Sequence, residues 1–396
     1  MSTLAAVAVV GLATVLVGCH SNPTATHTSS TTTTLPPLPP NVIAYVALAG
    51  TGGNLGFGTS VVPVNVTSSP ASVGSAIHVG TYPDAVAVSP NHRLALVANF
   101  TSDTVTPIDL ITGKALAPIP AGPGPAGIAI APDGTKAYVT DDGTLNTLAD
   151  TVTPIDLTTM KPLARIKVGP GPQGIAITPN GTKAFVADAG SVIAGQPGRI
   201  GHQVSPIDLA TGKALAPVNV GNGPIGIAIT PDGTTVFVTN LNSESVSPIN
   251  VAGDQALAPI AVEGGPVAVT IAGGIAWVVN TPVSGFPGND VEPITVANDK
   301  PGKPVKVSKG AQSIAASPNG QTVWIACLDA NRLVPIGVRS HKVHRAVAVY
   351  GGPFAVALAV VPQGSGTPAA SSSPTTSSTG SGSKSKKHKS ATSSTT

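Results

Sequence analysis

Carboxylates are the residues of this chain best suited to chemistry. Asp141 and Asp142 are adjacent, and Asp188 follows at the matching place of the next sequence repeat. Oxygen ligands from three such side chains can hold Ca²⁺, although no calcium-loop spacing surrounds them. The alternative is structural, because Asp and Asn side chains also cap loop backbone as Asx turns. We expect the capping role at this position and keep Ca²⁺ as the one cofactor that the pattern suggests.

Signatures of nucleophilic, metal and nucleotide chemistry are missing from the sequence. It contains no G-x-S-x-G, no H-E-x-x-H and no P-loop. The histidines do not cluster, and Cys327 lies in an apolar run, where a thiol is inert. The sequence therefore predicts no catalytic residue and no metal ligand set. It leaves open whether the protein is an enzyme and favours a non-enzymatic one.

The composition indicates which elements must position these residues. The chain of 396 residues holds 45 Gly and 39 Pro, the two poorest helix formers. Hydrophobic residues make up 41%, too many for a wholly disordered chain. The composition is that of an all-β protein with many short strands joined by Gly/Pro turns.

Self-comparison shows a repeat that recurs every 42 to 52 residues. A first apolar segment, P-x-G-I-A-I in its clearest copies, stands at 83–88, 125–130, 172–177, 224–229, 266–271, 311–316 and 353–358. A second stands at 44–48, 95–99, 137–141, 184–188, 236–240, 276–280 and 323–327. A third, V-x-P-I-D-L in its best copies, also occurs seven times, and a weaker fourth segment ends each unit.

The turns between these segments indicate antiparallel strands. Pro-Asp/Asn-Gly separates the first from the second, as at 132–134, and Thr-Gly-Lys separates the third from the fourth, as at 112–114. Both favour tight hairpins. Four antiparallel strands per repeat make a propeller blade, so the sequence predicts a seven-bladed β-propeller. The chain starts on a second strand and finishes on a first strand, so the C-terminal strand must close the ring.

These repeats resemble the YVTN-type β-propeller family, with P-x-G-I-A-I, then P-D-G, then Y-V-T-N, then V-x-x-I-D-x-x-T-G. The resemblance covers about 41–362 and is strongest in blades two to five. It implies an extracytoplasmic seven-bladed propeller of bacterial or archaeal surfaces. It implies no single function.

The connections between second and third strands vary in length. Three blades have 9 residues between matching positions, and the others have 14, 14, 16 and 19. All the insertions fall on one face, and scaffolds often carry function on such loops. We therefore select candidate binding residues on this long-loop face: Asp141, Asp142, Asp188, His202 and Asp290.

Charge is distributed unevenly along the chain. Residues 300–345 hold eight basic residues and one acid, whereas the ring as a whole is nearly neutral. A polynucleotide-binding domain would show a general basic excess, so nucleic acid is not an expected partner. The basic sector either protects an edge strand or faces an anionic envelope polymer. Its candidate residues are Lys303, Lys306, Lys309, Lys342 and Arg345.

The N-terminus indicates export. An uncharged apolar run of 14 residues from Leu4 to Val17 is shorter than the roughly 20 that span a bilayer and suits a signal peptide. Leu16-Val17-Gly18-Cys19 resembles the bacterial lipobox, which implies cleavage before Cys19 and its lipidation. The missing basic n-region departs from that pattern, and the alternative is a non-lipidated signal in which Cys19 is incidental.

These observations divide the chain into a signal peptide (1–18), a Ser/Thr/Pro-rich tether (19–40), the propeller (41–362) and a disordered Ser/Thr/Lys-rich tail (363–396). We expect a monomeric, extracytoplasmic lipoprotein that binds a protein or envelope polymer without catalysis. The alternative is an exported lactonase-like hydrolase or lyase, which would need a convergent His/Glu/Asp set at the channel mouth.

Overall fold

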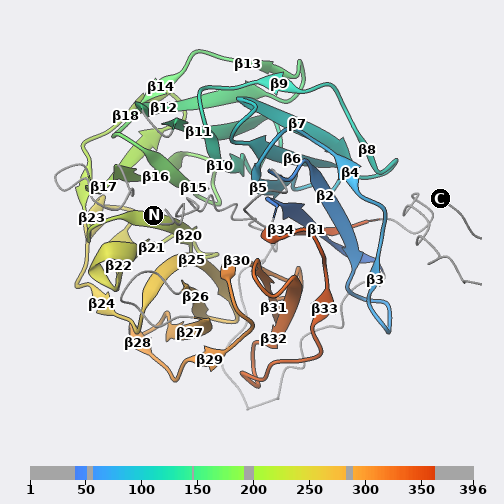
Figure 1. Cartoon of the computed structure of the whole chain (residues 1–396). Helices are drawn as coiled ribbons and strands as arrows, with labels where there is room; N and C mark the ends of the chain where they lie inside the picture. Colours follow the sequence, from blue (N-terminus) through green and yellow to red (C-terminus); the bar gives the residue numbers. More distant parts are fainter. Residues whose placement is uncertain (1–40, 51–56, 145–146, 191–199, 282–288, 362–396) are drawn as a thin grey trace, which may run out of the picture.

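The fold is a ring of seven antiparallel sheets around a common axis (Figure 1). The computed structural model describes residues 41–50, 57–144, 147–190, 200–281 and 289–361. The signal, tether and tail predictions lie outside the described residues, as do parts of the four longer loops. The predicted seven-bladed β-propeller is confirmed.

Each sheet is one blade, and its strands run outward from the axis in chain order, except that the last strand of the chain is the innermost strand of blade 1. From blade 1 to blade 7, the innermost strands are β34 (Pro353–Val360), β5 (Pro83–Val88), β10 (Pro125–Ile130), β15 (Pro172–Ile177), β20 (Pro224–Ile229), β25 (Gly265–Ala272) and β30 (Ala311–Ala316). The second strands are β1 (Val42–Leu48), β6 (Leu94–Asn99), β11 (Lys136–Thr144), β16 (Lys183–Gly190), β21 (Thr235–Asn240), β26 (Ile275–Thr281) and β31 (Thr322–Cys327). The third strands are β2 (Ser60–Asn65), β7 (Thr104–Asp109), β12 (Thr147–Asp156), β17 (Ile200–Asp208), β22 (Ser245–Asn250), β27 (Asp290–Thr295) and β32 (Arg332–Gly337).

The outer edge of six blades differs from the single fourth strand that the sequence predicts. In these blades it consists of two short pieces that both pair with the third strand. In blade 2, Pro118 lies between the pieces, and proline cannot donate to a ladder. The pieces are β3 (Ser72–Val73) and β4 (Ile77–His78), β8 (Lys114–Ala115) and β9 (Ile119–Pro120), β13 (Lys161–Pro162) and β14 (Ile166–Lys167), β18 (Lys213–Ala214) and β19 (Val218–Asn219), β23 (Gln255–Ala256) and β24 (Ile260–Ala261), β28 (Lys300–Pro301) and β29 (Val305–Lys306), with β33 (Val347–Ala348) alone in blade 7.

The C-terminal strand closes the ring, as predicted. β34 pairs antiparallel with β1, with Ala357 opposite Tyr45 and Val360 opposite Val42. Blade 1 is therefore built from both ends of the propeller, and its innermost strand packs against β5 on one side and β30 on the other. The closure leaves no unpaired seam between the first and last repeats.

Close packing at the axis explains the glycine of the P-x-G-I-A-I segment. A Cβ added to Gly174 would lie 2.3 Å from the carbonyl oxygen of Ile225 in the next blade. The innermost strands are buried on both sides, and Trp277, Phe185 and Phe237 are among the largest fully buried side chains. The described residues include one short 3₁₀ helix, η1 (Leu241–Ser243), and none of their helices has the length and apolarity to cross a membrane.

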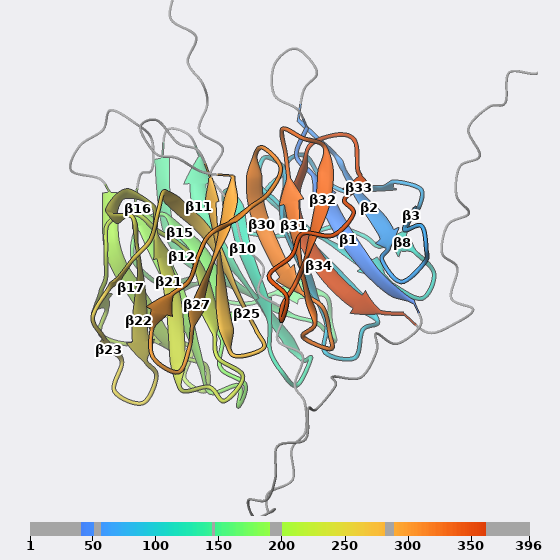
Figure 2. The ribbon, with the colours of Figure 1, turned by 90° about the horizontal axis from the view of Figure 1, so that it is seen from below.

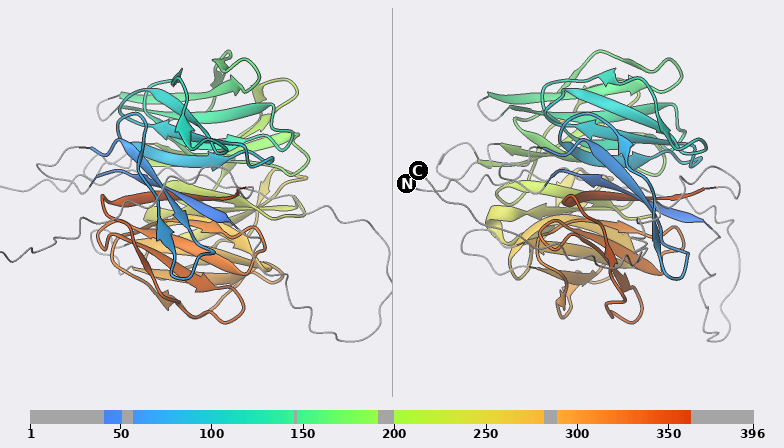
Figure 3. Two further views of the ribbon diagram at one scale, coloured as in Figure 1. Left: turned by 90° about the vertical axis from the view of Figure 1, so that its right-hand side faces the viewer. Right: turned by 45° about the vertical axis from the view of Figure 1, so that its right-hand side comes forward.

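Two faces of the ring differ in their connections. The short-turn face carries the hairpins between first and second strands and between third and fourth strands. There, Asp109 accepts hydrogen bonds from the backbone N–H groups of Ile111 and Thr112 at 2.8 and 3.1 Å. The long-loop face carries the connections between second and third strands, where β11 and β12 extend toward one another. Figures 2 and 3 show the blades from the side.

Candidate functional site

Polar side chains at the ends of the second strands join the strands of each blade at the long-loop face. In blade 2, the amide nitrogen of Asn99 donates to Thr106 Oγ1 at 2.9 Å. In blade 5, Asn240 donates to Ser247 Oγ at 2.9 Å. These are contacts to the third strand and not Asx turns within the loop. The expectation of an Asx turn is therefore wrong for these two residues, although Asn99 also donates to the Thr104 carbonyl oxygen at 3.2 Å, where the loop ends. We call it the latch position: Asn99, Asp141, Asp188, Asn240 and Asn280 in blades 2 to 6.

Asp141 is the best-partnered latch residue. Its carboxylate accepts hydrogen bonds from Thr151 Oγ1 at 2.6 Å, from Thr153 Oγ1 at 2.8 Å and from the Gly122 N–H at 3.0 Å. The Arg165 Nε lies 3.9 Å away. Burial raises the pKa of Asp141, while these hydrogen bonds and the arginine oppose the rise. Asp141 is fully buried, so the structure gives this predicted binding residue an internal role.

Asp188 occupies the same position in blade 4 with fewer partners. Its Oδ2 accepts a hydrogen bond from Ser205 Oγ at 2.7 Å, while its buried Oδ1 has no hydrogen-bond partner. Gln203 stands where blade 3 has Thr151, which removes one hydroxyl donor. Burial raises the pKa of Asp188 to about 7. Asp188 therefore changes its charge near neutral pH.

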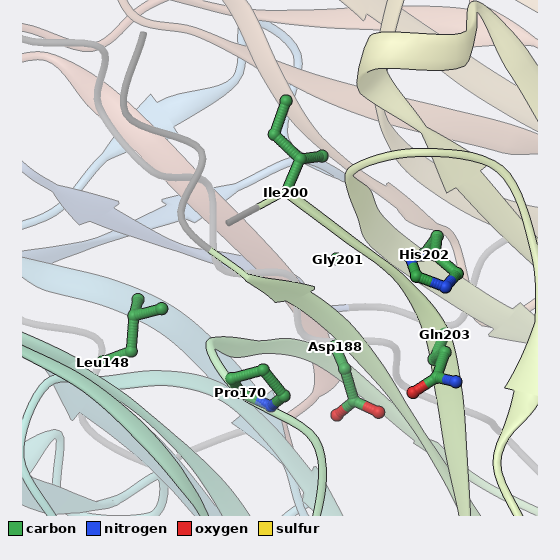
Figure 4. A pocket seen from close by; sticks show the side chains of 7 residues that line it. All are labelled: Leu148, Pro170, Asp188, Ile200, Gly201, His202 and Gln203. Atoms are coloured by element: carbon green, nitrogen blue, oxygen red, sulfur yellow. The ribbon is translucent and has the colours of Figure 1, made fainter. Parts of the chain in front are cut away.

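A pocket of about 290 Å³ lies beside Asp188 on the long-loop side of blades 3 and 4. Figure 4 shows Leu148 and Pro170 on one side, His202 and Gln203 on the other, and Asp188 between them. Ile200 and Gly201 complete the lining. The pocket thus unites two of the predicted binding residues, Asp188 and His202, with an apolar wall contributed by the neighbouring blade.

The other predicted residues of this face do not join the pocket. Asp142 is buried next to Asp141, and burial raises its pKa to about 7. Asp290, in blade 6, accepts hydrogen bonds from Asn280 Nδ2 at 2.9 Å and from Lys306 Nζ at 2.8 Å. Within the described ranges, no three His, Cys, Asp or Glu side chains form a group that could hold a metal ion.

The five residues of the predicted basic flank are spread over blades 6 and 7 and do not share one face. Lys306 lies opposite Asp290 at the long-loop end of the edge strand, and Lys309 follows it toward blade 7. Lys342 lies in the short-turn hairpin of blade 7, where its carbonyl accepts the Gly337 N–H. Lys303 and Arg345 are exposed on the outer edge between these ends.

The residues that sequence reasoning missed are the latch partners and the apolar wall of the pocket. Thr153 and Ser205 stand at the same position of the third segment, which carries a hydroxyl in blades 2 to 5, and that pattern is a readable signal. Leu148 lies at the start of β12 in another blade, before the part of the strand that repeats, so no repeat pattern marks it.

The comparisons with known proteins show the fold alone. Hydrazine synthase from Kuenenia stuttgartiensis is 21% identical with a TM-score of 0.59, and the match covers 82% of this chain and 99% of that one. A functionally unknown protein from Desulfotomaculum acetoxidans is 16% identical with a TM-score of 0.64, covering 81% and 99%. No protein-family model and no curated protein matches the chain.

Proposed function

We propose that this protein is a lipid-anchored, non-enzymatic binding scaffold of the cell envelope that holds its ligand on the long-loop face. The pocket beside Asp188 carries the proposal, because it is a hollow on the face with variable loops and has a carboxyl group in its lining. The lipobox-like sequence before Cys19 and the YVTN-like repeats support an extracytoplasmic location.

The chemistry of the pocket fits an organic amine. The Asp188 carboxylate in the pocket lining can pair with an ammonium group, and charge-assisted hydrogen bonds of this kind are the strong ones. Leu148, Pro170 and Ile200 provide apolar surface for a short hydrocarbon chain. A basic side chain of a partner protein or a small free amine would present the same group.

Titration calorimetry with n-butylamine at pH 8 tests the binding site. We expect saturable heat for the natural protein and none for Asp188→Asn, a change that blades 2, 5 and 6 already carry at the latch position. Asp142→Asn is the matched control, because this buried carboxyl on the same face does not line the pocket. Equal heats for all three proteins would overturn the amine site.

Metabolic labelling with a fatty-acid analogue tests the anchor separately. We expect label on the natural protein and on Cys327→Ser, and none on Cys19→Ser, because Cys327 is buried within blade 7. An unlabelled natural protein would remove the anchor from the proposal and leave the amine site standing.

The alternative of an exported lactonase-like hydrolase or lyase stays a prediction. It requires convergent acid, base or metal-binding side chains at the channel mouth. No contact among the described residues favours it over the scaffold.

A further inference from the structure

The two faces of the propeller differ in charge. Lysines and arginines gather at the hairpins of the short-turn face, and seven of them are exposed: Arg93, Lys114, Lys161, Lys213, Lys300, Arg339 and Lys342. At the long-loop ends of the strands, acidic residues prevail, including Asp103, Asp150, Glu244, Glu263 and Asp329. The ring is therefore polarised along its axis although its total charge is nearly zero.

The acidic residues of the short-turn face are engaged in holding its turns. Asp156 accepts hydrogen bonds from the N–H groups of Thr158 and Thr159, as Asp208 does in blade 4 and Asp109 in blade 2. The lysines that follow these turns reach outward into solvent. These carboxylates keep their charge, and Asp133 and Asp232 are themselves exposed, so this face presents an excess of exposed cations over exposed acids.

In three consecutive blades, an exposed leucine follows the lysine with which the outer edge strand begins, at the short-turn face. Leu116, Leu163 and Leu215 are 42%, 42% and 38% exposed, and each lies two residues after a lysine. Residues two apart along a strand point to the same side. Each of these edges therefore offers a cation and an apolar side chain together, the combination that favours a membrane interface.

Both ends of the propeller also leave from the short-turn face. The Val361 N–H donates to the Asn41 carbonyl at 3.0 Å, and Val360 N lies 3.4 Å from His92 Nδ1 in the first hairpin of blade 2. Residues 1–40 precede this point, and the tail that follows it carries four lysines. The segment that bears Cys19 and the basic tail are thus both attached on this side.

We propose that the short-turn face, with its Lys–Leu edges, is a docking surface for an anionic lipid bilayer. This proposal rests on the proposed function. With the short-turn face on the membrane, the pocket beside Asp188 on the opposite face points away from the lipid. Docking needs no covalent lipid: basic residues are attracted to anionic headgroups, and leucines gain by leaving water. Of the anionic partners, lipid fits best, because a soluble polymer would leave the leucines exposed.

Vesicle sedimentation tests the docking with full-length protein carrying Cys19→Ser, so that the anchor plays no part. Lys384, Lys386, Lys387 and Lys389 are also replaced by glutamine, which removes the contribution of the tail. We expect this protein to bind phosphatidylglycerol-containing vesicles at low salt and to leave pure phosphatidylcholine vesicles in the supernatant. Equal sedimentation with both lipids, or with neither, would overturn the proposal.

Matched variants locate the surface. Replacing Lys161 and Lys213 with glutamine is expected to weaken vesicle binding about 25-fold, since each cation near the surface contributes about fivefold. Replacing Lys167 and Arg332, which lie on the long-loop side, removes the same charge and should change binding by less than about twofold. Equal losses in the two pairs would refute the assignment of this face.

Two further variants separate lipid from polymer. Leu163→Ser with Leu215→Ser should reduce the vesicle binding that persists at high salt while leaving the charge unchanged. Binding to soluble polyphosphate with no binding to vesicles would replace the lipid by an anionic polymer. Loss of labelling at Cys19 in cells, by contrast, bears only on the anchor.

Discussion

Thr153 Oγ1 lies 2.8 Å from Asp141 Oδ2, and this contact joins the second and third strands of blade 3 at the long-loop edge. A buried carboxylate that loses a donor retains its desolvation cost. We expect Thr153→Val to lower the free energy of unfolding by about 1–3 kcal/mol. Urea denaturation measures the change, and Thr153→Ser, which keeps the hydroxyl, should restore most of it. If valine and serine behave alike, the hydrogen bond contributes nothing.

The closing strand gives a second prediction. Deleting residues 353–396 removes β34, which is the partner of β1 and the innermost strand of blade 1. The inner edge of β1 then has no partner and the packing faces of β5 and β30 are uncovered, so we expect a sharp fall in the melting temperature. Deleting only 363–396 is the control and should leave it unchanged. Similar melting curves for both truncations would contradict closure by β34.

Burial of two carboxyl groups makes stability depend on pH. The pKa values of Asp142 and Asp188 are raised to about 7, whereas an unfolded Asp titrates near 3.9. Between these values the folded state binds more protons, so stability falls as pH rises from about 4 to 7. Urea midpoints across this range should show the fall, and replacing both residues with asparagine should flatten it. A natural protein that grows more stable over this interval would contradict the raised pKa values.

The architecture was predictable because each blade repeats the same local signals. Seven blades are indicated by the apolar segments and the Pro-Asp/Asn-Gly turns. Their closure is indicated by a chain that starts on a second strand and finishes on a first strand. The division of six outer strands was not predicted, although a proline that interrupts such a strand, as Pro118 does in blade 2, is visible in the sequence.

The sequence predicted on which face of the ring the candidate site lies, but not the contacts within the site. Repeat alignment placed Asp188 and His202 on the long-loop side, where the structure unites them in one pocket. The partner of Asp290 was missed because Lys306 belongs to the outer edge, and only the register of β27 with β29 brings the two together. The contact of Asp141 with Thr153 runs diagonally between strands, and only the hydroxyl repeated at the Thr153 position in blades 2 to 5 indicates it in the sequence.

The affinity for n-butylamine as a function of pH tests the central claim most directly, namely that the Asp188 pocket is a binding site. An alkylammonium ion stays charged throughout this range, so only the protein titrates. We predict that affinity rises from pH 6 to pH 8 as the Asp188 carboxyl ionises near pH 7, and that Asp142→Asn keeps this profile. No saturable binding, or a profile that Asp188→Asn leaves unchanged, would contradict the claim.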